Sequence, residues 1–176
     1  KQRPENFREA QHWYHEFLDS FPRDEESPVM NYQLADLLLE NKSFHAAALE
    51  YERTAYDYPA HEKASAAGYA AVYTHRENLS SAEKSDKPTI KRDVIRSSLR
   101  FADVFPEHDK AALVMGAALE DIFSMKDYPF AVATDRKMLE KFPGASRAQL
   151  RSAWLVPGMR PEKLHCRFVD ATRSLS

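Results

Sequence analysis

Several residue types are scarce in this chain, and each scarcity narrows what the protein can be. Cys166 is the one cysteine among 176 residues, so no disulfide can form within the chain and the redox compartment stays open. Glycine occurs 4 times and proline 10 times, which suits helices with short turns better than sheets with tight hairpins. No apolar run approaches the roughly 20 residues of a membrane-spanning helix, so we expect no direct membrane insertion.

Charge of one sign is not in excess either. The formal net charge of −2 gives no overall attraction to nucleic acid or anionic lipid. The sequence has no phosphate-binding loop, no dinucleotide-binding glycine fingerprint and no evident pair of catalytic carboxylates. We therefore expect no enzyme activity, no catalytic residues and no cofactor.

An aromatic residue followed by proline recurs four times along the chain. The prolines of these pairs are separated by 37, 47 and 37 residues, and the pairs are Phe21-Pro22, Tyr58-Pro59, Phe105-Pro106 and Phe142-Pro143. Equal outer intervals with a longer middle one indicate a repeat that carries one insertion.

The stretch that precedes each aromatic–proline pair has helical periodicity. In residues 44–59, the apolar side chains fall within an arc of about 100° on a helix. Ser43 is the predicted N-cap, and Pro59 ends the helix because proline cannot donate a backbone bond. We name this helix type helix B; further copies precede Pro22, Pro106 and Pro143, the last with Pro129 in its first turn.

A second helix type, helix A, lies before each of the last three copies. The first of these helices begins near Pro28, and the third has Asp109 as its predicted cap. Small residues on one side allow close approach of a neighbouring helix; they are Ala35, Ala67, Gly68, Ala71, Gly116 and Ala118. Asn41-Lys42 and Lys126-Asp127 form the predicted turns from helix A into helix B. Because short helices are marginal alone, stacked pairs would supply the burial.

These boundaries predict a half repeat and three full repeats. The surplus of the middle interval is assigned to 78–89, a polar stretch predicted to lengthen one turn. Further helices are expected at about 146–156 and 161–174, either as a cap or as the start of more repeats. The predicted divisions are 1–22, 23–59, 60–106, 107–143 and 144–176.

The chain resembles the tetratricopeptide repeat family over about residues 5–156. In the first full repeat the matching residues, in order, are Leu34-Ala35, Phe44, Ala47, Tyr51 and Pro59. The glycines that the family has near Ala35 and at the turn between the helices are absent, and Asp135 replaces an aromatic. The resemblance implies an all-α, right-handed superhelix of antiparallel helix pairs, an α-solenoid.

The residue pattern and spacing of the repeats are most similar to those of a bacterial cell-envelope subgroup that includes BamD and the TolA-binding periplasmic coordinator. This resemblance implies a periplasmic or envelope location, with the cytoplasm as the alternative. The chain begins at Lys1 and on half a repeat, from which we expect a fragment or a processed form of a larger protein.

The resemblance also implies a binding surface. Helix A residues line the concave face in this family, and a protein or peptide partner is expected there. The corresponding residues are Tyr32, Asp36, Leu39, Glu40, Tyr69, Tyr73, Arg76, Glu77, Gly116, Glu120 and Phe123. Relatives that grip a peptide carboxylate have lysine and asparagine at such positions, so we predict no carboxylate clamp here. Tyr32 and Tyr69 could equally be packing residues.

Three other groups of residues have weaker functional readings. His12 and His15 lie one turn apart but lack a third zinc ligand nearby, so no metal site is expected. The basic stretch 84–100 places Arg92, Arg96 and Arg100 opposite an apolar face, which favours a solvated surface over a phosphate site. His165-Cys166 lacks a third catalytic member.

The expected function is therefore a non-catalytic scaffold that binds a partner segment in its groove. Two alternatives remain: an architectural or self-associating segment of a longer repeat protein, and a regulatory domain of a larger enzyme.

Overall fold

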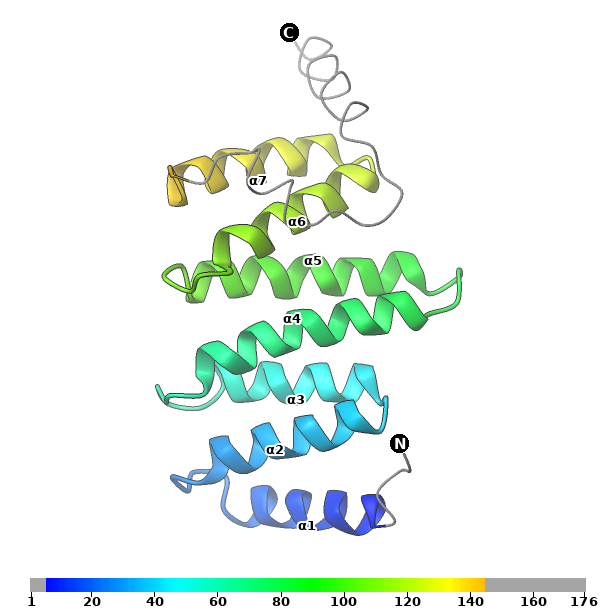
Figure 1. The fold of residues 1–176 in the computed structure, drawn as a ribbon, viewed down its shortest axis with the longest axis vertical. Helices are drawn as coiled ribbons and strands as arrows, with labels where there is room; N and C mark the ends of the chain where they lie inside the picture. The colour runs from blue at the N-terminus through cyan, green and yellow to red at the C-terminus, as the bar shows by residue number, and fades with distance from the viewer. Residues whose placement is uncertain (1–5, 145–176) are drawn as a thin grey trace, which may run out of the picture. The chain divides into compact units, whose positions relative to one another are not determined.

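The structure, a computed structural model, describes residues 6–144. Every regular element in this range is an α-helix, which confirms the all-α class. The helices are α1 (Phe7–Ser20), α2 (Ser27–Glu40), α3 (Phe44–Tyr56), α4 (Ala64–Ser81), α5 (Lys87–Val104), α6 (Ala111–Ser124) and α7 (Tyr128–Lys141) (Figure 1). The helices predicted at 146–156 and 161–174, and Cys166, lie outside the described residues.

The chain divides into two compact units, residues 1–108 and 109–176. In the first, α1 to α5 lie side by side in chain order, and successive helices run in opposite directions (Figure 1). Consecutive helices of this unit pack on each other, from α1 on α2 through to α4 on α5. In the second unit, α6 and α7 form one antiparallel pair. Helices A and B thus alternate along the chain and pack in pairs. The right-handed superhelix remains a prediction.

Three of the four aromatic–proline pairs end their helices in the same way. Phe21, Phe105 and Phe142 are C-caps with φ between −131° and −120° and ψ between 57° and 65°. Each donates its backbone N–H to the carbonyl oxygen four residues earlier. This geometry follows because a residue before proline avoids the helical region. Tyr58 differs, because α3 has Asp57 as its C-cap and Tyr58 lies one residue beyond.

The predicted helix caps are only partly confirmed. Ser43 is the N-cap residue of α3, as predicted, but its side chain caps no backbone group; its hydroxyl accepts a hydrogen bond from Asn41 Nδ2 at 3.1 Å. Asp109 lies before the N-cap of α6, which is Lys110. Asp127, which the sequence analysis placed only in a turn, caps α7 by accepting from the Phe130 N–H at 3.2 Å.

The prediction of a long turn at 78–89 is also wrong. Residues 78–81 continue α4, and residues 87–89 already belong to α5. Both helices have 18 residues, compared with 14 in α2 and 13 in α3. Most of the surplus therefore lengthens two helices that pack on each other, where additional paired length buries more surface.

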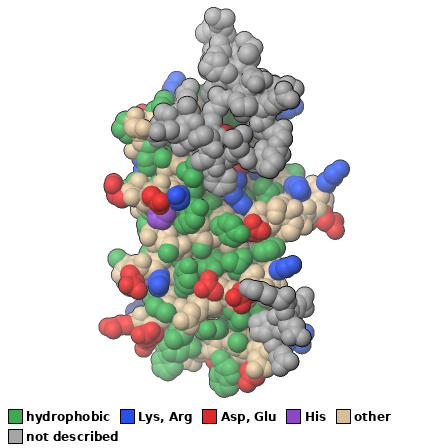
Figure 2. All heavy atoms as spheres, in the orientation of Figure 1, with side chains coloured by type: hydrophobic (Ala, Val, Ile, Leu, Met, Phe, Trp, Pro, Cys, Tyr) green, Lys and Arg blue, Asp and Glu red, His purple; other side chains and the backbone are tan. Residues whose placement is uncertain are grey.

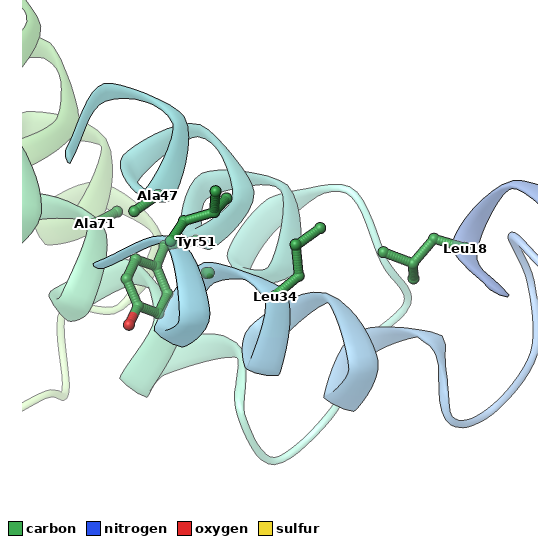
Figure 3. Close-up of a cluster of buried hydrophobic side chains, with 7 residues drawn as sticks. Leu18, Leu34, Ala47, Tyr51 and Ala71 are labelled. Atoms are coloured by element: carbon green, nitrogen blue, oxygen red, sulfur yellow. The ribbon is translucent and has the colours of Figure 1, made fainter. Parts of the chain in front are cut away.

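One core cluster of the first unit combines the Tyr51 ring with aliphatic and small side chains. Leu18, Leu34, Ala47, Tyr51 and Ala71 come from α1, α2, α3 and α4 and are buried together (Figure 3). The small residues predicted to allow close helix approach in this unit, Ala35, Ala67, Gly68 and Ala71, are all buried.

The contacts around Gly68 explain why this position holds the smallest residue. A Cβ atom at Gly68 would lie 2.9 Å from Phe105 Cε2 and 3.0 Å from Phe101 Cδ2. These separations are shorter than carbon–carbon contacts allow. Because Gly68 has no side chain, the ring of Phe101 in α5 and that of its C-cap residue Phe105 can pack directly against α4.

Candidate partner-binding surface

The predicted binding residues occupy matching positions of α2 and α4. Each residue on α4 follows its α2 counterpart by 37 residues: Tyr32 and Tyr69, Asp36 and Tyr73, Leu39 and Arg76, Glu40 and Glu77. Both helices belong to the first unit. Glu120 and Phe123 lie on α6, in the second unit.

Asp36 and Tyr32 of α2 form one connected cluster with Tyr51 of α3. The Tyr32 and Tyr51 rings meet edge to face, with centroids 5.4 Å apart and an interplanar angle of 69°. The buried Tyr51 donates its hydroxyl hydrogen to Asp36 Oδ1. Burial and the nearby Asp36 charge raise the pKa of Tyr32, and burial and the bond to Asp36 raise the pKa of Tyr51. Both phenols therefore stay neutral, and Asp36 is held in place at the surface.

Tyr32 and Leu39 combine packing with partial exposure. Both side chains are half-buried against the core cluster of the first unit. Asp36 and Glu40 on the same helix are exposed. The surface of α2 is thus an apolar base with carboxylates that reach solvent.

Tyr69 of α4 packs against neighbouring aromatic side chains. Its ring stacks on His108, with centroids 5.7 Å apart and an interplanar angle of 23°, and also contacts the buried Phe101 of α5 at 5.9 Å. Of the two readings left open for Tyr69, the contacts favour the packing one.

Tyr73, four residues further along α4, is the exposed aromatic residue of the predicted set. Its side chain is 52% exposed. The negative charge of Glu77 raises the pKa of the Tyr73 phenol, so the ring presents a neutral donor beside a carboxylate. Arg76 and Glu77 are half-buried. Figure 2 shows carboxylates interspersed with hydrophobic side chains on the face seen in that view.

The two candidates on α6 differ from each other. Glu120 is exposed, and Phe123 is half-buried. The Phe123 ring meets Tyr128 of α7 edge to face, with centroids 5.4 Å apart. Phe123 therefore contributes to packing within the α6–α7 pair.

Sequence reasoning missed a buried ionisable pair between α3 and α4. His75 Nε2 lies 3.2 Å from Glu52 Oε1, and the His75 side chain is buried. Burial raises the pKa of Glu52, but His75, Ser97 and Arg96 lower it by a larger amount, so its pKa is lowered. The second imidazole nitrogen, His75 Nδ1, has no hydrogen-bond partner among the described residues, so the imidazole does not link the carboxylate to a nucleophile as a catalytic base would. We therefore read the cluster as structural.

The basic stretch behaves largely as predicted. Arg92, Arg96 and Arg100 are exposed, whereas Val94 and Ala102 on the other side of α5 are buried. Two of the arginines have neighbours within the protein. Arg96 pairs with Asp93 at 2.9 Å, and the Arg100 guanidinium lies 3.8 Å from the centroid of the Tyr56 ring.

Within the described range, no group of three or more metal-ligating side chains is placed to hold an ion. His12 is exposed and contacts the Trp13 ring. Among the helices of residues 6–144, none has both the length and the apolarity needed to cross a bilayer. His165-Cys166 lies beyond the described residues.

The chain was compared with known families, curated proteins and solved structures. None of them matches it.

Proposed function

We propose that this chain is a non-catalytic, tetratricopeptide-like scaffold that binds a segment of a partner protein on helix A residues of the first unit. In this proposal the helix pairs continue as a right-handed superhelix, and the protein acts in the bacterial envelope. The binding residues are Asp36 and Glu40 of α2 with Tyr73 and Glu77 of α4.

The observation that carries the proposal is the exposure of Tyr73. Its predicted companion Tyr69, one turn away, is engaged with Phe101 and His108, but Tyr73 is 52% exposed. Tyrosine offers a large, rigid contact area with a hydrogen-bonding end, which is why tyrosine is enriched at the centres of interfaces.

The neighbouring charges favour a cationic partner segment. Asp36 and Glu40 are exposed, and Glu77 lies close enough to Tyr73 to raise the phenol's pKa. Opposite charge at the edge of an interface increases the rate of encounter and selects among partners. A lysine or arginine side chain could pair with a carboxylate and also lie over the Tyr73 ring.

A selection from a displayed random-peptide library, followed by fluorescence polarisation, tests this proposal. We expect the selected peptides to be basic and to lose at least tenfold in affinity towards Tyr73→Ser, because an exposed interface aromatic is removed. Binding should also weaken as salt is raised.

Leu49→Ser is the matched control. Leu49 is an apolar residue of α3 with 45% exposure, so its replacement removes a similar amount of exposed apolar surface away from the proposed site. Selected peptides that bind Tyr73→Ser as tightly as the parent would overturn the proposal. Unchanged far-ultraviolet circular dichroism of both variants would show that the fold is intact.

A further inference from the structure

Asp36 of α2 is an exposed carboxylate that a core residue holds in place. The Tyr51 hydroxyl donates to Asp36 Oδ1, and Tyr51 of α3 is only 1% exposed. Asp36 itself reaches solvent, and among the described residues no lysine or arginine pairs with it. The carboxylate is therefore fixed at one oxygen, while its charge is not neutralised within this part of the chain.

A helix pair of this kind also forms without the Tyr51–Asp36 hydrogen bond. In α4–α5 the counterparts of Asp36 and Tyr51 are Tyr73 and Ser98. Tyr73 is exposed, and the buried Ser98 hydroxyl has no hydrogen-bond partner among the described residues. A phenylalanine at position 51 would fill the core without needing a partner. The bond is thus not a requirement of the fold, which leaves the orientation of Asp36 as what it supplies.

Apolar side chains lie beside Asp36 on the same helix. Tyr32 is one turn before Asp36 and Leu39 is one turn after it, and both are half-buried against the core cluster. The Tyr32 ring meets the Tyr51 ring edge to face, so Tyr51 fixes the ring as well as the carboxylate. Glu40, a further turn along, is exposed. An apolar strip beside negative charge matches a side chain with a long apolar stem and a cationic end.

The restraint on Asp36 changes what an ion pair at this place contributes. An exposed ion pair usually contributes little, partly because two mobile side chains must be ordered to form it. Here one of the two is already ordered by the bond from the buried Tyr51 hydroxyl. A cationic side chain that pairs with Asp36 therefore loses less of its binding free energy to ordering.

We propose that Tyr32, Asp36 and Leu39 bind one long cationic side chain of the partner segment, a lysine or an arginine, and that Tyr51 is the positioning residue that orients Asp36 towards it. The stem of the bound side chain lies over Tyr32 and Leu39, and its charged end pairs with Asp36. This inference rests on the proposed function, because it names what the α2 part of that surface recognises.

The test uses a fluorescein-labelled peptide from the library selection, titrated with the full chain and followed by fluorescence polarisation. Each lysine of the peptide is replaced in turn by norleucine, and each arginine by citrulline, which removes the charge and keeps the stem. We expect one position at which this replacement weakens binding at least tenfold for the parent protein but less than twofold for Asp36→Asn. At that position 2,4-diaminobutyric acid, which keeps a charge on a shorter stem, should also weaken binding.

Tyr51→Phe tests the positioning role. It keeps the ring and removes the bond to Asp36, so binding should weaken about fivefold, and the preference for the charged over the uncharged residue should fall by the same factor. In the Asp36→Asn background, Tyr51→Phe should have no further effect on binding.

Thr54→Val is the matched control. It removes a different buried hydrogen bond between α2 and α3, that from Asn31 Nδ2 to Thr54 Oγ1 at 2.9 Å, which does not involve Asp36. Affinity and charge preference should both be unchanged. Urea unfolding of each variant shows that it is folded under the conditions of the binding assay.

The outcomes separate this inference from the proposed function. Peptides that depend on Tyr73 but bind Tyr51→Phe with the parent's affinity and charge preference would overturn the inference alone. So would equal losses for Tyr51→Phe and Thr54→Val, equal binding of the diaminobutyric acid peptide, or the lack of any peptide charge whose effect depends on Asp36. A selection that yields no Tyr73-dependent peptide would overturn the proposed function, and the inference with it.

Discussion

The helix pairs α2–α3 and α6–α7 show one backbone plan with two different interiors. Residues of the second pair follow their counterparts in the first by 84 residues, and α2 and α6 have equal lengths of 14 residues. Both pairs turn through a lysine in the left-handed region: Lys42 has φ of 62° and Lys126 has φ of 63°. Glycine adopts this region most readily, so both turns hold the geometry without the residue that usually supplies it.

The buried residues at matching positions of the two pairs differ in polarity. In α2–α3, Asn31 bonds to Thr54, and the Tyr58 hydroxyl donates to Asn31 Oδ1 at 3.2 Å. In α6–α7, the counterparts of Asn31 and Thr54 are Met115 and Met138, both buried. A polar pair is tolerated inside because its groups are bonded, and an apolar pair needs no bonds. Replacing one member of the polar pair alone would leave a buried polar group without its bond.

Tyr51 marks the largest difference between the two pairs. In α3 this side chain is buried and bonds to Asp36. Its counterpart in α7 is Asp135, which is half-buried. The same helix position thus holds a core ring in one pair and a carboxylate in the other.

Tyr51→Asp is expected to have the largest effect, because it copies the α7 residue into α3. The change empties a packed site and buries a carboxylate beside Asp36, and we expect a loss of about 4 kcal/mol in the free energy of unfolding. Tyr51→Phe keeps the ring and loses one hydrogen bond, for about 1 kcal/mol. Urea unfolding followed by circular dichroism measures both. A loss for Tyr51→Asp no greater than that for Tyr51→Phe would contradict this account.

Gly68→Leu tests whether facing residues must change in pairs. The new side chain would overlap Phe101 and Phe105, and we expect a loss of about 2 kcal/mol in the free energy of unfolding. Phe101→Ala alone should also destabilise the chain, because it leaves a cavity. The double variant should be more stable than the sum of the two losses predicts. Strict additivity in a double-mutant cycle would show that the two positions are independent.

Much of the fold could be predicted because its signals are local. Prolines end or begin helices through their own backbone chemistry, and apolar periodicity fixes which side of each helix is buried. The boundaries of α2, α3 and α7 follow from such signals. The extent of α4 and α5 did not, because residues 78–89 are polar and their helical state depends on how the two helices pack.

The binding surface was harder to predict for the same reason. Tyr69 and Tyr73 are the same residue type, one turn apart on one helix, and only the position of Phe101 and His108 separates packing from exposure. The Glu52–His75 pair joins residues 23 positions apart that carry no local motif. The match of Gly68 to Phe101 likewise depends on a contact between helices.

The Glu52–His75 pair predicts a pH dependence for the α3–α4 contact. The pKa of the Glu52 carboxyl is lowered in the folded protein from an ordinary value of 4.5. Its contribution to stability is therefore complete above that pH and is lost as the pH falls through the folded-state pKa. Glu52→Gln should cost about 1 kcal/mol at pH 7, and its deficit relative to the parent should shrink on acidification. Urea unfolding of both proteins at a series of pH values measures the difference, and a constant deficit down to pH 3 would contradict the prediction.

The smallest expected effects are gains, and they test the shared turn. Lys42→Gly and Lys126→Gly each relieve a side chain held at positive φ, although glycine gains entropy in the unfolded chain. We expect each change to stabilise the protein by about 0.5 to 1 kcal/mol. Because the two φ angles agree within a degree, the two gains should be equal. Thermal and urea unfolding of the two variants would show this. A gain at only one turn would mean that the two helix pairs share a backbone outline without sharing its energetics.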